Sequence, residues 1–336
     1  MESKRLVVPK LTLGMRIKRF FSEYVIIYGI LILFVAVALT TGIVLKDFTV
    51  FLSISNLMNV MRQISMTAII AAGMYFVLVS GGIDISVGAT VGLVNILFSG
   101  LMVWYGMHPV FAVSISFGVA LVVGLVNGVL VAYFGIAPMI ATLGTQSVMR
   151  GLIFVITNAY PVFNLPTTIY WIGNGYLLKY IPIPVVIMLF IFILANFISK
   201  RTKFGRSVYA IGGNIEAAYL SGIKEKQVRV ICYMVVNIMA AVSAIILTSR
   251  LSSGQPNSGL TWEFEAIIAA VIGGVSITGG KGKAYYALLG AIMLGLFTNG
   301  MTLLNINSYF QQMIKGIILI SAIGLDVYML RKKAKV

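Results

Sequence analysis

The sequence predicts an all-α polytopic membrane protein with about ten transmembrane helices. Mean hydropathy over the 336 residues is +1.01, and only 10% of residues are charged, whereas soluble domains carry about 25%. Apolar runs recur from Tyr24 to Leu330, and each has the roughly twenty residues needed to cross the hydrocarbon layer of a bilayer. Because these runs are continuously apolar rather than alternating, a β-barrel is disfavoured.

Charge placement orients the chain. The net charge is +16, yet 17 of the 25 Lys and Arg residues lie in the stretches 1–24, 200–229 and 331–336, all at the boundaries of apolar runs. This positive-inside pattern places the three stretches at the cytoplasmic face and argues against nucleic acid as a partner. We therefore expect a cytoplasmic N-terminal segment (1–23), a single transmembrane domain (24–330) and a cytoplasmic tail (331–336).

The spans follow from this anchor. The first is expected to be retained in the membrane, because a long charged leader precedes it. An even number of spans puts both termini inside, and the 34 glycines predict closely packed and broken helices. The segment 51–63 is expected to be an interfacial or partly inserted helix. The expected spans are 24–45, 64–80, 85–106, 109–134, 138–157, 180–199, 229–250, 264–279, 285–305 and 311–330.

Two external connections are long for a compact bundle. Residues 158–179 contain two prolines and two glycines, and residues 251–263 have the composition of turns. They are candidates for contact with a partner. The alternative is that both are solvated loops, with Trp171 and Trp262 as interface anchors.

The chain contains a candidate internal sequence repeat at an offset of 198 residues. The segment 68–72 recurs as 266–270, and Gly81 and Gly82 match Gly279 and Gly280. In total, 10 of the 25 positions from 68 to 92 are identical to their counterparts. Transporters are often built from repeats, and their sites lie where the repeats meet. Shared composition of two glycine-rich apolar segments is the alternative explanation.

Enzyme motifs fail when tested. The glycine-rich stretch 274–281 lacks the lysine position of a phosphate-binding loop, and no H-E-x-x-H, C-x-x-C or G-x-S-x-G pattern occurs. The single cysteine, Cys232, is expected to be a small buried residue. If transport requires ATP, another chain must hydrolyse it.

Asp84 is the clearest ionisable residue in the apolar part of the chain. It follows the helix-breaking residues Ser80, Gly81 and Gly82. It is expected either to line a translocation route or to cap the next helix, with Arg62 and Arg150 as possible counter-charges. One intramembrane acid is fewer than an ion-coupled carrier typically shows. Neutral polar residues, which serve either a route or helix packing, occur in other spans: Asn127, Thr142, Thr145 and Asn299.

The basic island 201–222 has the pattern of a short docking helix. Asn214 is a good N-cap, residues 215–221 can form two turns, and Gly222 supplies the stop. Glu216 lies in the first turn, where the helix dipole favours it, and Ala217 and Ala218 are expected to present a small flat face. Such a helix is marginal alone and needs a surface to dock against.

These residues resemble a known family. Glu216, Ala217 and Ala218 followed by Gly222 look like the coupling motif of ABC-importer permeases, although its later isoleucine and Leu-Pro are absent. Five further stretches occur in the same order as in the permeases of bacterial monosaccharide importers of the ribose, xylose, arabinose and galactose group. They are 80–88, 141–151, 202–206, 210–214 and 273–282.

The resemblance implies a type II-like importer fold and a set of partners. These are a sugar ABC ATPase, which carries the ATP and Mg, an extracytoplasmic sugar-binding protein, and a second permease copy or paralogue in the bacterial cytoplasmic membrane. No cofactor is expected on this chain itself. The coupling loop, 200–228, would dock the ATPase, and the residues implied in docking are Phe204, Gly205, Arg206, Asn214, Glu216, Ala217, Ala218 and Gly222.

Three alternatives remain beside this interpretation. A branched-chain amino-acid permease belongs to the same broad superfamily. The Gly-Gly-Ile-Asp and Phe-Gly-Arg motifs resemble the sugar permeases of that superfamily more closely. An ion-coupled carrier is disfavoured by the single intramembrane acid and by the docking-helix motif. A membrane-embedded enzyme lacks a catalytic constellation.

Overall fold

A computed structural model describes the backbone of residues 13–334 and the side chains of residues 26–324, 327 and 328. The expected N-terminal segment and C-terminal tail therefore lie partly outside the described residues, which exclude 1–12 and 335–336. Within the described part, the chain is a bundle of α-helices with one short β-hairpin.

Every expected span contains one helix. These helices are α1 (Leu13–Leu45), α3 (Ile54–Val79), α4 (Val87–Val103), α5 (Pro109–Ala132), α6 (Pro138–Thr157), α8 (Ile183–Arg201), α11 (Glu225–Leu251), α12 (Trp262–Ile272), α13 (Ala284–Leu303) and α14 (Ser308–Ala334). The shorter elements are α2 (Thr49–Leu52), η1 (Thr167–Ile169), α7 (Tyr170–Asn174), β1 (Tyr176–Leu177), β2 (Ile181–Pro182), α9 (Lys203–Gly213) and α10 (Ile215–Leu220).

The lengths of these helices identify a multi-pass membrane protein. Among the described residues, 7 helices are long and apolar enough to cross a bilayer: α1, α3, α5, α6, α8, α11 and α13. Helix α4 is apolar but has only 17 residues. Helix α12 has 11 residues, which at 1.5 Å per residue is about 16 Å, half of the hydrocarbon thickness. The figure of about ten crossings therefore stays a prediction.

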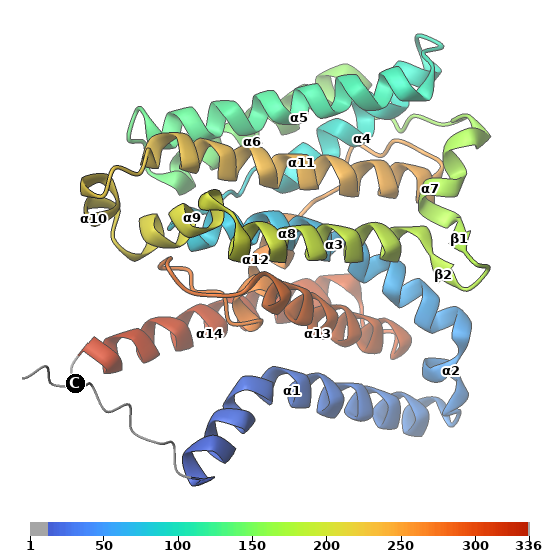
Figure 1. Cartoon of the computed structure of the whole chain (residues 1–336). Helices are drawn as coiled ribbons and strands as arrows, with labels where there is room; N and C mark the ends of the chain where they lie inside the picture. The colour runs from blue at the N-terminus through green and yellow to red at the C-terminus, as the bar shows by residue number, and fades with distance from the viewer. Residues whose placement is uncertain (1–12, 335–336) are drawn as a thin grey trace, which may run out of the picture.

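The bundle has two distinct ends (Figure 1). Helices α9 and α10 lie at one end, together with the start of α1 and the end of α14, and α2, α7 and the β-hairpin lie at the other. Helix α11 packs against α3, α4 and α5 in the centre of the molecule. Helix α3 is the most enclosed of these seven helices, since 94% of its most apolar stretch of 18 residues is buried.

Helix α3 begins earlier than the sequence predicted. Residues 54–63 continue the helix rather than forming a separate interfacial segment, and only α2 precedes them. The Ser53 hydroxyl accepts a hydrogen bond from the Asn56 backbone N–H at 3.2 Å, which caps the helix. Asn56 and Asn299 then exchange two amide hydrogen bonds of 3.2 and 3.0 Å, which tie α3 to α13.

The connection 251–263 is not a solvated loop. Its residues Gly254 and Ser258 are buried, and the Gln255 backbone N–H donates to the Asn95 side-chain oxygen at 2.6 Å. Gly254 also forms a β-bridge with Val162. A side chain at Gly259 would overlap the Gly88 backbone. Glycine thus lets this extended segment enter the bundle alongside α4, and Trp262 begins α12 rather than anchoring an external loop.

The other long connection does lie at the surface. Residues 158–179 fold into η1, α7 and β1, and Trp171 is 60% exposed. The Gly173 backbone N–H donates to the Ser249 hydroxyl at 2.7 Å, which fixes this cap to the end of α11.

The two repeated segments meet in space. Helix α12 packs against α3, and the Gly280 backbone N–H donates to the Val79 carbonyl at 2.9 Å. Gly81 and its repeat partner Gly279 both adopt positive φ, +81° and +90°, and they are close neighbours. The helices end differently: α12 stops at Ile272, five positions before the residue that matches the end of α3. The expectation of a helix to residue 279 was therefore wrong, because this glycine-rich stretch forms a turn.

Candidate functional site

A buried polar network surrounds Asp84. Its Oδ1 accepts hydrogen bonds from the backbone N–H and hydroxyl of Ser86 at 2.8 and 2.5 Å, and its Oδ2 accepts from the Asn237 side chain at 2.9 Å. The side chain of Asn127 donates to the Ser86 hydroxyl at 2.7 Å and accepts from the Thr145 hydroxyl. Three of the predicted polar residues, Asp84, Asn127 and Thr145, thus form one network at the start of α4.

Asp84 has no cationic partner among the residues that the structure describes. Arg62 instead contacts Asn59, the Asn174 carbonyl and the ring of Tyr176. Arg150 donates to the Ser258 carbonyl at 2.8 Å. The suggested counter-charges therefore do not pair with Asp84, whose oxygens are satisfied by neutral donors while the residue is fully buried. This arrangement favours the capping interpretation over the route.

The remaining predicted polar positions are separate. Ser80 donates to the Val77 carbonyl at 2.7 Å, and Gly81 makes the turn that ends α3, followed by Gly82 against the Tyr233 hydroxyl. Thr142 donates to the Pro138 carbonyl at 2.8 Å, and Asn299 pairs with Asn56 as described. The structure thus brings together only part of the predicted set.

The short helix that follows Asn214 forms as the sequence indicates. The Asn214 side chain accepts from the Ala217 backbone N–H at 2.9 Å. Gly222 stops the helix with φ +81°. The small flat face does not form, because Ala218 is 3% exposed while Ala217 points outward. The surface of α10 is instead offered by exposed Tyr219 and Leu220 together with Glu216.

Helix α9 connects this surface to the core. The Thr202 hydroxyl caps the start of this helix by accepting a hydrogen bond from the Gly205 backbone N–H at 3.2 Å. Gly205 is buried against the end of α8, and Arg206 is exposed. Phe204 packs against Phe76 of α3, with ring centroids 5.8 Å apart. The Tyr209 hydroxyl contacts the Tyr75 hydroxyl at 2.7 Å and donates to the Gly282 carbonyl at 2.7 Å.

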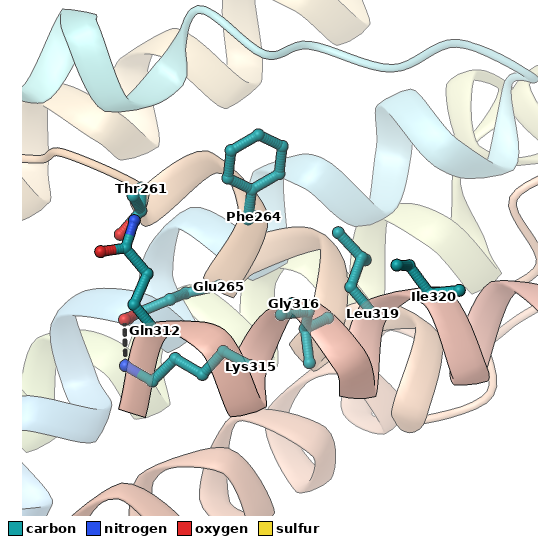
Figure 2. Close-up of a pocket in the computed structure, with 9 residues that line it drawn as sticks. Thr261, Phe264, Glu265, Gln312, Lys315, Gly316, Leu319 and Ile320 are labelled. Carbon is teal, nitrogen blue, oxygen red and sulfur yellow. Dashed lines mark hydrogen bonds and ion pairs between the residues drawn. The ribbon is translucent and has the colours of Figure 1, made fainter. Parts of the chain in front are cut away.

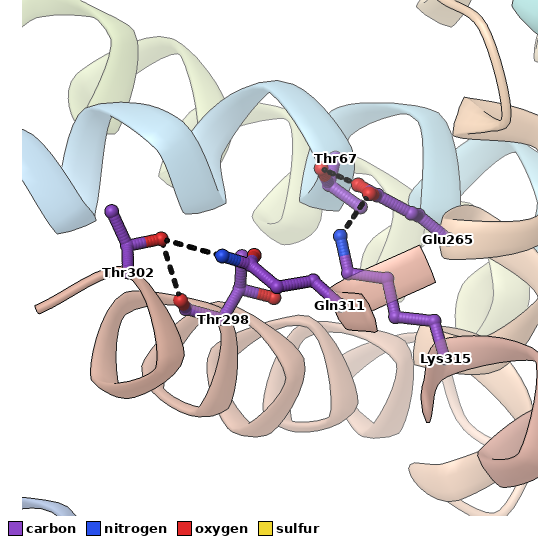
Figure 3. A network of polar contacts seen from close by, with 6 residues as sticks. All are labelled: Thr67, Glu265, Thr298, Thr302, Gln311 and Lys315. Atoms are coloured by element: carbon purple, nitrogen blue, oxygen red, sulfur yellow. Dashed lines mark hydrogen bonds and ion pairs between the residues drawn. The ribbon is translucent and has the colours of Figure 1, made fainter. Parts of the chain in front are cut away.

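A second polar group lies between α12 and α14. The Lys315 ammonium and the Glu265 carboxylate form an ion pair at 2.6 Å, and the Thr67 hydroxyl donates to Glu265 at 3.3 Å. Figure 3 shows this group next to Gln311, which donates to the Thr302 hydroxyl at 3.4 Å. The pair borders a cavity of about 300 Å³ (Figure 2).

A third group lies where α12 begins. Glu263 is 3% exposed, and its Oε1 accepts from the Gln146 side chain at 3.1 Å. Within the described residues, Glu263 Oε2 and two Arg150 side-chain nitrogens have no hydrogen-bond partner. Asp84 is therefore not the only acid inside the bundle, and the expectation of one intramembrane acid was wrong.

Sequence reasoning missed Glu263, Glu265 and Lys315. Glu263 and Glu265 lie at the outer edge of the expected span 264–279, where a charged residue is usual. Lys315 lies 50 positions after Glu265 in the chain. One signal was available. The offset of 198 that matches the repeats pairs Thr67 with Glu265, and these two residues touch.

Comparison with known proteins agrees with this architecture. Residues 56–323 match a family model described as the permease component of branched-chain amino acid transport systems. A ribose import permease from Bacillus subtilis is 40% identical over 286 residues, which covers 84% of this chain and 87% of the relative. No solved structure matches the chain.

Permeases named for other sugars are also similar. A xylose transport system permease from Haemophilus influenzae is 32% identical, covering 82% of this chain and 90% of the relative. A D-allose transport system permease from Escherichia coli is 33% identical, covering 82% and 84%. The chain belongs to the membrane permease family described as the permease component of branched-chain amino acid transport systems.

Proposed function

We propose that this chain is the transmembrane subunit of an ATP-driven ABC importer that carries a monosaccharide, a pentose or hexose, across the cytoplasmic membrane. The observation that carries the proposal is the similarity over more than four fifths of the chain to permeases named for ribose, xylose and allose. The exposed docking helix and the multi-pass bundle are consistent with it.

The ATPase docks on α10. Exposed Glu216, Tyr219 and Leu220 provide one acidic and two apolar contacts, and a groove of about 380 Å³ lies beside them, lined by Ile215 and Glu225 as well. The partner holds ATP and Mg, and the basic residues of the coupling loop contact anionic lipid head groups. This end of the bundle, where α1 begins and α14 ends, is cytoplasmic.

Helix α9 transmits movement of the ATPase. Tyr209 bonds at once to α3 and to the turn that follows α12, so a shift of α9 moves the two repeated segments together. The opposite end, with exposed Trp171 and Tyr180, receives the sugar-binding protein. A second permease copy or paralogue completes the transporter.

A branched-chain amino acid is the second candidate substrate, favoured by the description of the family model. Relatives named for sugars weigh more heavily, because their identity reaches 37–40% over most of the chain. An ion-coupled carrier is disfavoured by the family to which the chain belongs and by the docking helix, and no longer by a scarcity of acidic residues inside the bundle.

The docking role is tested by Glu216→Lys in the complex reconstituted into liposomes. Reversing the charge at the exposed start of α10 also opposes the helix dipole, so we expect ATP-driven sugar uptake to be lost while the chain still inserts and folds. Asp47→Lys, the same kind of charge reversal in the exposed turn between α1 and α2, is the control. Uptake at the unmodified rate would remove α10 from the docking surface.

A further inference from the structure

The cavity between α12 and α14 places a few polar side chains in a largely apolar wall. Its volume is about 300 Å³, and Thr261, Glu265, Gln312 and Lys315 line it together with Phe264 and Leu319 (Figure 2). None of the predicted route residues lines it. Pockets for small molecules begin at about this volume and combine apolar walls with a few polar groups.

The ion pair lies about midway along the length of the bundle, and both of its side chains remain partly accessible. Thr67, which contacts Glu265, lies midway along α3 between Ile54 and Val79. The side chains of Lys315 and Glu265 are 17% and 18% exposed. Charged side chains that face lipid at such depth are costly and rare. The face of α12 and α14 therefore borders water or another subunit rather than lipid.

The chemistry of the wall matches a neutral solute rich in hydroxyls. Glu265 and Lys315 neutralise each other, yet the carboxylate keeps free lone pairs and the ammonium keeps N–H donors. Gln312 adds an amide. Phe264, which is 40% exposed, adds the apolar face of its ring. A zwitterionic amino acid could use both charges only by separating a pair that already bonds at 2.6 Å.

The location also has a structural reason. Thr67 and Glu265 occupy matching positions of the two repeated segments, and they meet where α3 and α12 pack. Transport sites lie at the interface between repeats. A site on a route must bind weakly enough to release its solute, and a shallow, partly open cavity has this character.

Resting on the proposed function, we propose that Glu265, Lys315 and Gln312 form a weak monosaccharide-binding subsite on the translocation route. The intact ion pair orients the sugar hydroxyls, and Phe264 contacts the ring. The subsite is distinct from the Asp84 network, which is structural.

Thiol labelling tests the proposal. The native thiol of Cys232 is fully buried. A Gly316→Cys variant carrying Cys232→Ala therefore places the one thiol of the chain in the cavity wall, at a position where a Cβ meets no other atom. The intact permease–ATPase complex in liposomes is treated with a hydrophilic, membrane-impermeant thiol reagent. The matched controls are Val155→Cys on α6 and Ile193→Cys on α8, exposed apolar positions where lipid suppresses the reactive thiolate.

We expect the Gly316→Cys thiol to react at least about ten-fold faster than the controls, because only a hydrated thiol ionises. D-ribose, D-xylose or D-allose should slow the reaction about two-fold at a concentration equal to its Kd. Adding Glu265→Gln or Lys315→Met should abolish the sugar protection and leave the thiol reactive. Asp47→Asn, at an exposed position outside the cavity, should leave protection intact.

Each other outcome has a definite meaning. A thiol as slow as the controls places this face in lipid, and a reactive thiol that no sugar protects shows a hydrated face without a subsite. Either result overturns the inference, while ATP-driven sugar uptake by the unmodified complex would keep the proposed function. Protection and uptake of leucine in place of sugar would overturn the proposed function itself.

Discussion

At the residue scale, two sets of polar side chains inside the bundle are joined by hydrogen bonds. Asp84 is enclosed by Ser86, Asn127 and Asn237, and Glu265 is joined to Lys315 and Thr67. An unpaired polar group in a membrane bundle would be costly. The two sets differ in exposure, which is why we assign stability to the first and transport to the second.

Replacing Asp84 with Ala should destabilise the chain. The change leaves the Ser86 backbone N–H and one of the two Asn237 side-chain N–H groups without an acceptor, at about 1–3 kcal/mol for each orphaned group. We expect a lower unfolding temperature and less monodisperse protein in detergent, measured by heating followed by size-exclusion chromatography. Asp47→Asn, at an exposed turn, is the control. Unchanged stability with lost transport would place Asp84 on the route instead.

The sequence was informative about Asp84 and uninformative about Lys315. Asp84 stands in a local pattern of glycine and serine that predicts a helix break, and its partner Ser86 is two residues away. The contact of Lys315 with Glu265 joins residues 50 positions apart on two separate helices. No local pattern encodes such a contact.

At the element scale, the two ends of α10 were predictable from their residue types. Asn214 and Gly222 bound α10 as their types require, through a side-chain acceptor and a positive φ. The extent of α12 was not predictable, because residues 273–279 are apolar enough to continue a helix. They turn because packing brings Gly280 against Val79.

Changing Gly222 to Val should weaken docking of the ATPase. Valine is strained at φ +81°, because its branched Cβ crowds the backbone in this region. The end of α10 must then shift. We expect less ATPase to co-purify with the permease in mild detergent. Gly213→Ala is the matched control, since a Cβ there meets no other atom; equal recovery of the ATPase with both variants would contradict the assignment.

Replacing Tyr209 with Phe should uncouple hydrolysis from transport. The change removes both hydroxyl contacts that join α9 to Tyr75 and Gly282, and it keeps the ring in place. We expect the number of sugars imported per ATP to fall several-fold while ATP hydrolysis continues, measured together in liposomes. Tyr328→Phe, exposed on α14, controls for the loss of a hydroxyl. An unchanged ratio would show that α9 acts through other contacts.

At the scale of the whole molecule, composition determined the class and packing determined the site. Hydropathy predicted a helix in all ten expected ranges, and the basic loop 200–228 lies at one end of the bundle with the start of α1 and the end of α14. The position of the segment 251–263 could not be predicted from composition. Its glycines and polar residues read as a solvated loop, but they let the backbone enter the bundle and bring Glu263 inside.

The most direct test of the account is uptake by the complex purified with this chain from its native membranes. The complex is reconstituted into liposomes and supplied with its co-purified binding protein, and entry of labelled D-ribose, D-xylose, D-allose and leucine is measured. We predict that at least one monosaccharide enters, that entry requires ATP, and that leucine stays outside. Entry of leucine, or sugar entry driven by a sodium or proton gradient without ATP, would contradict the account.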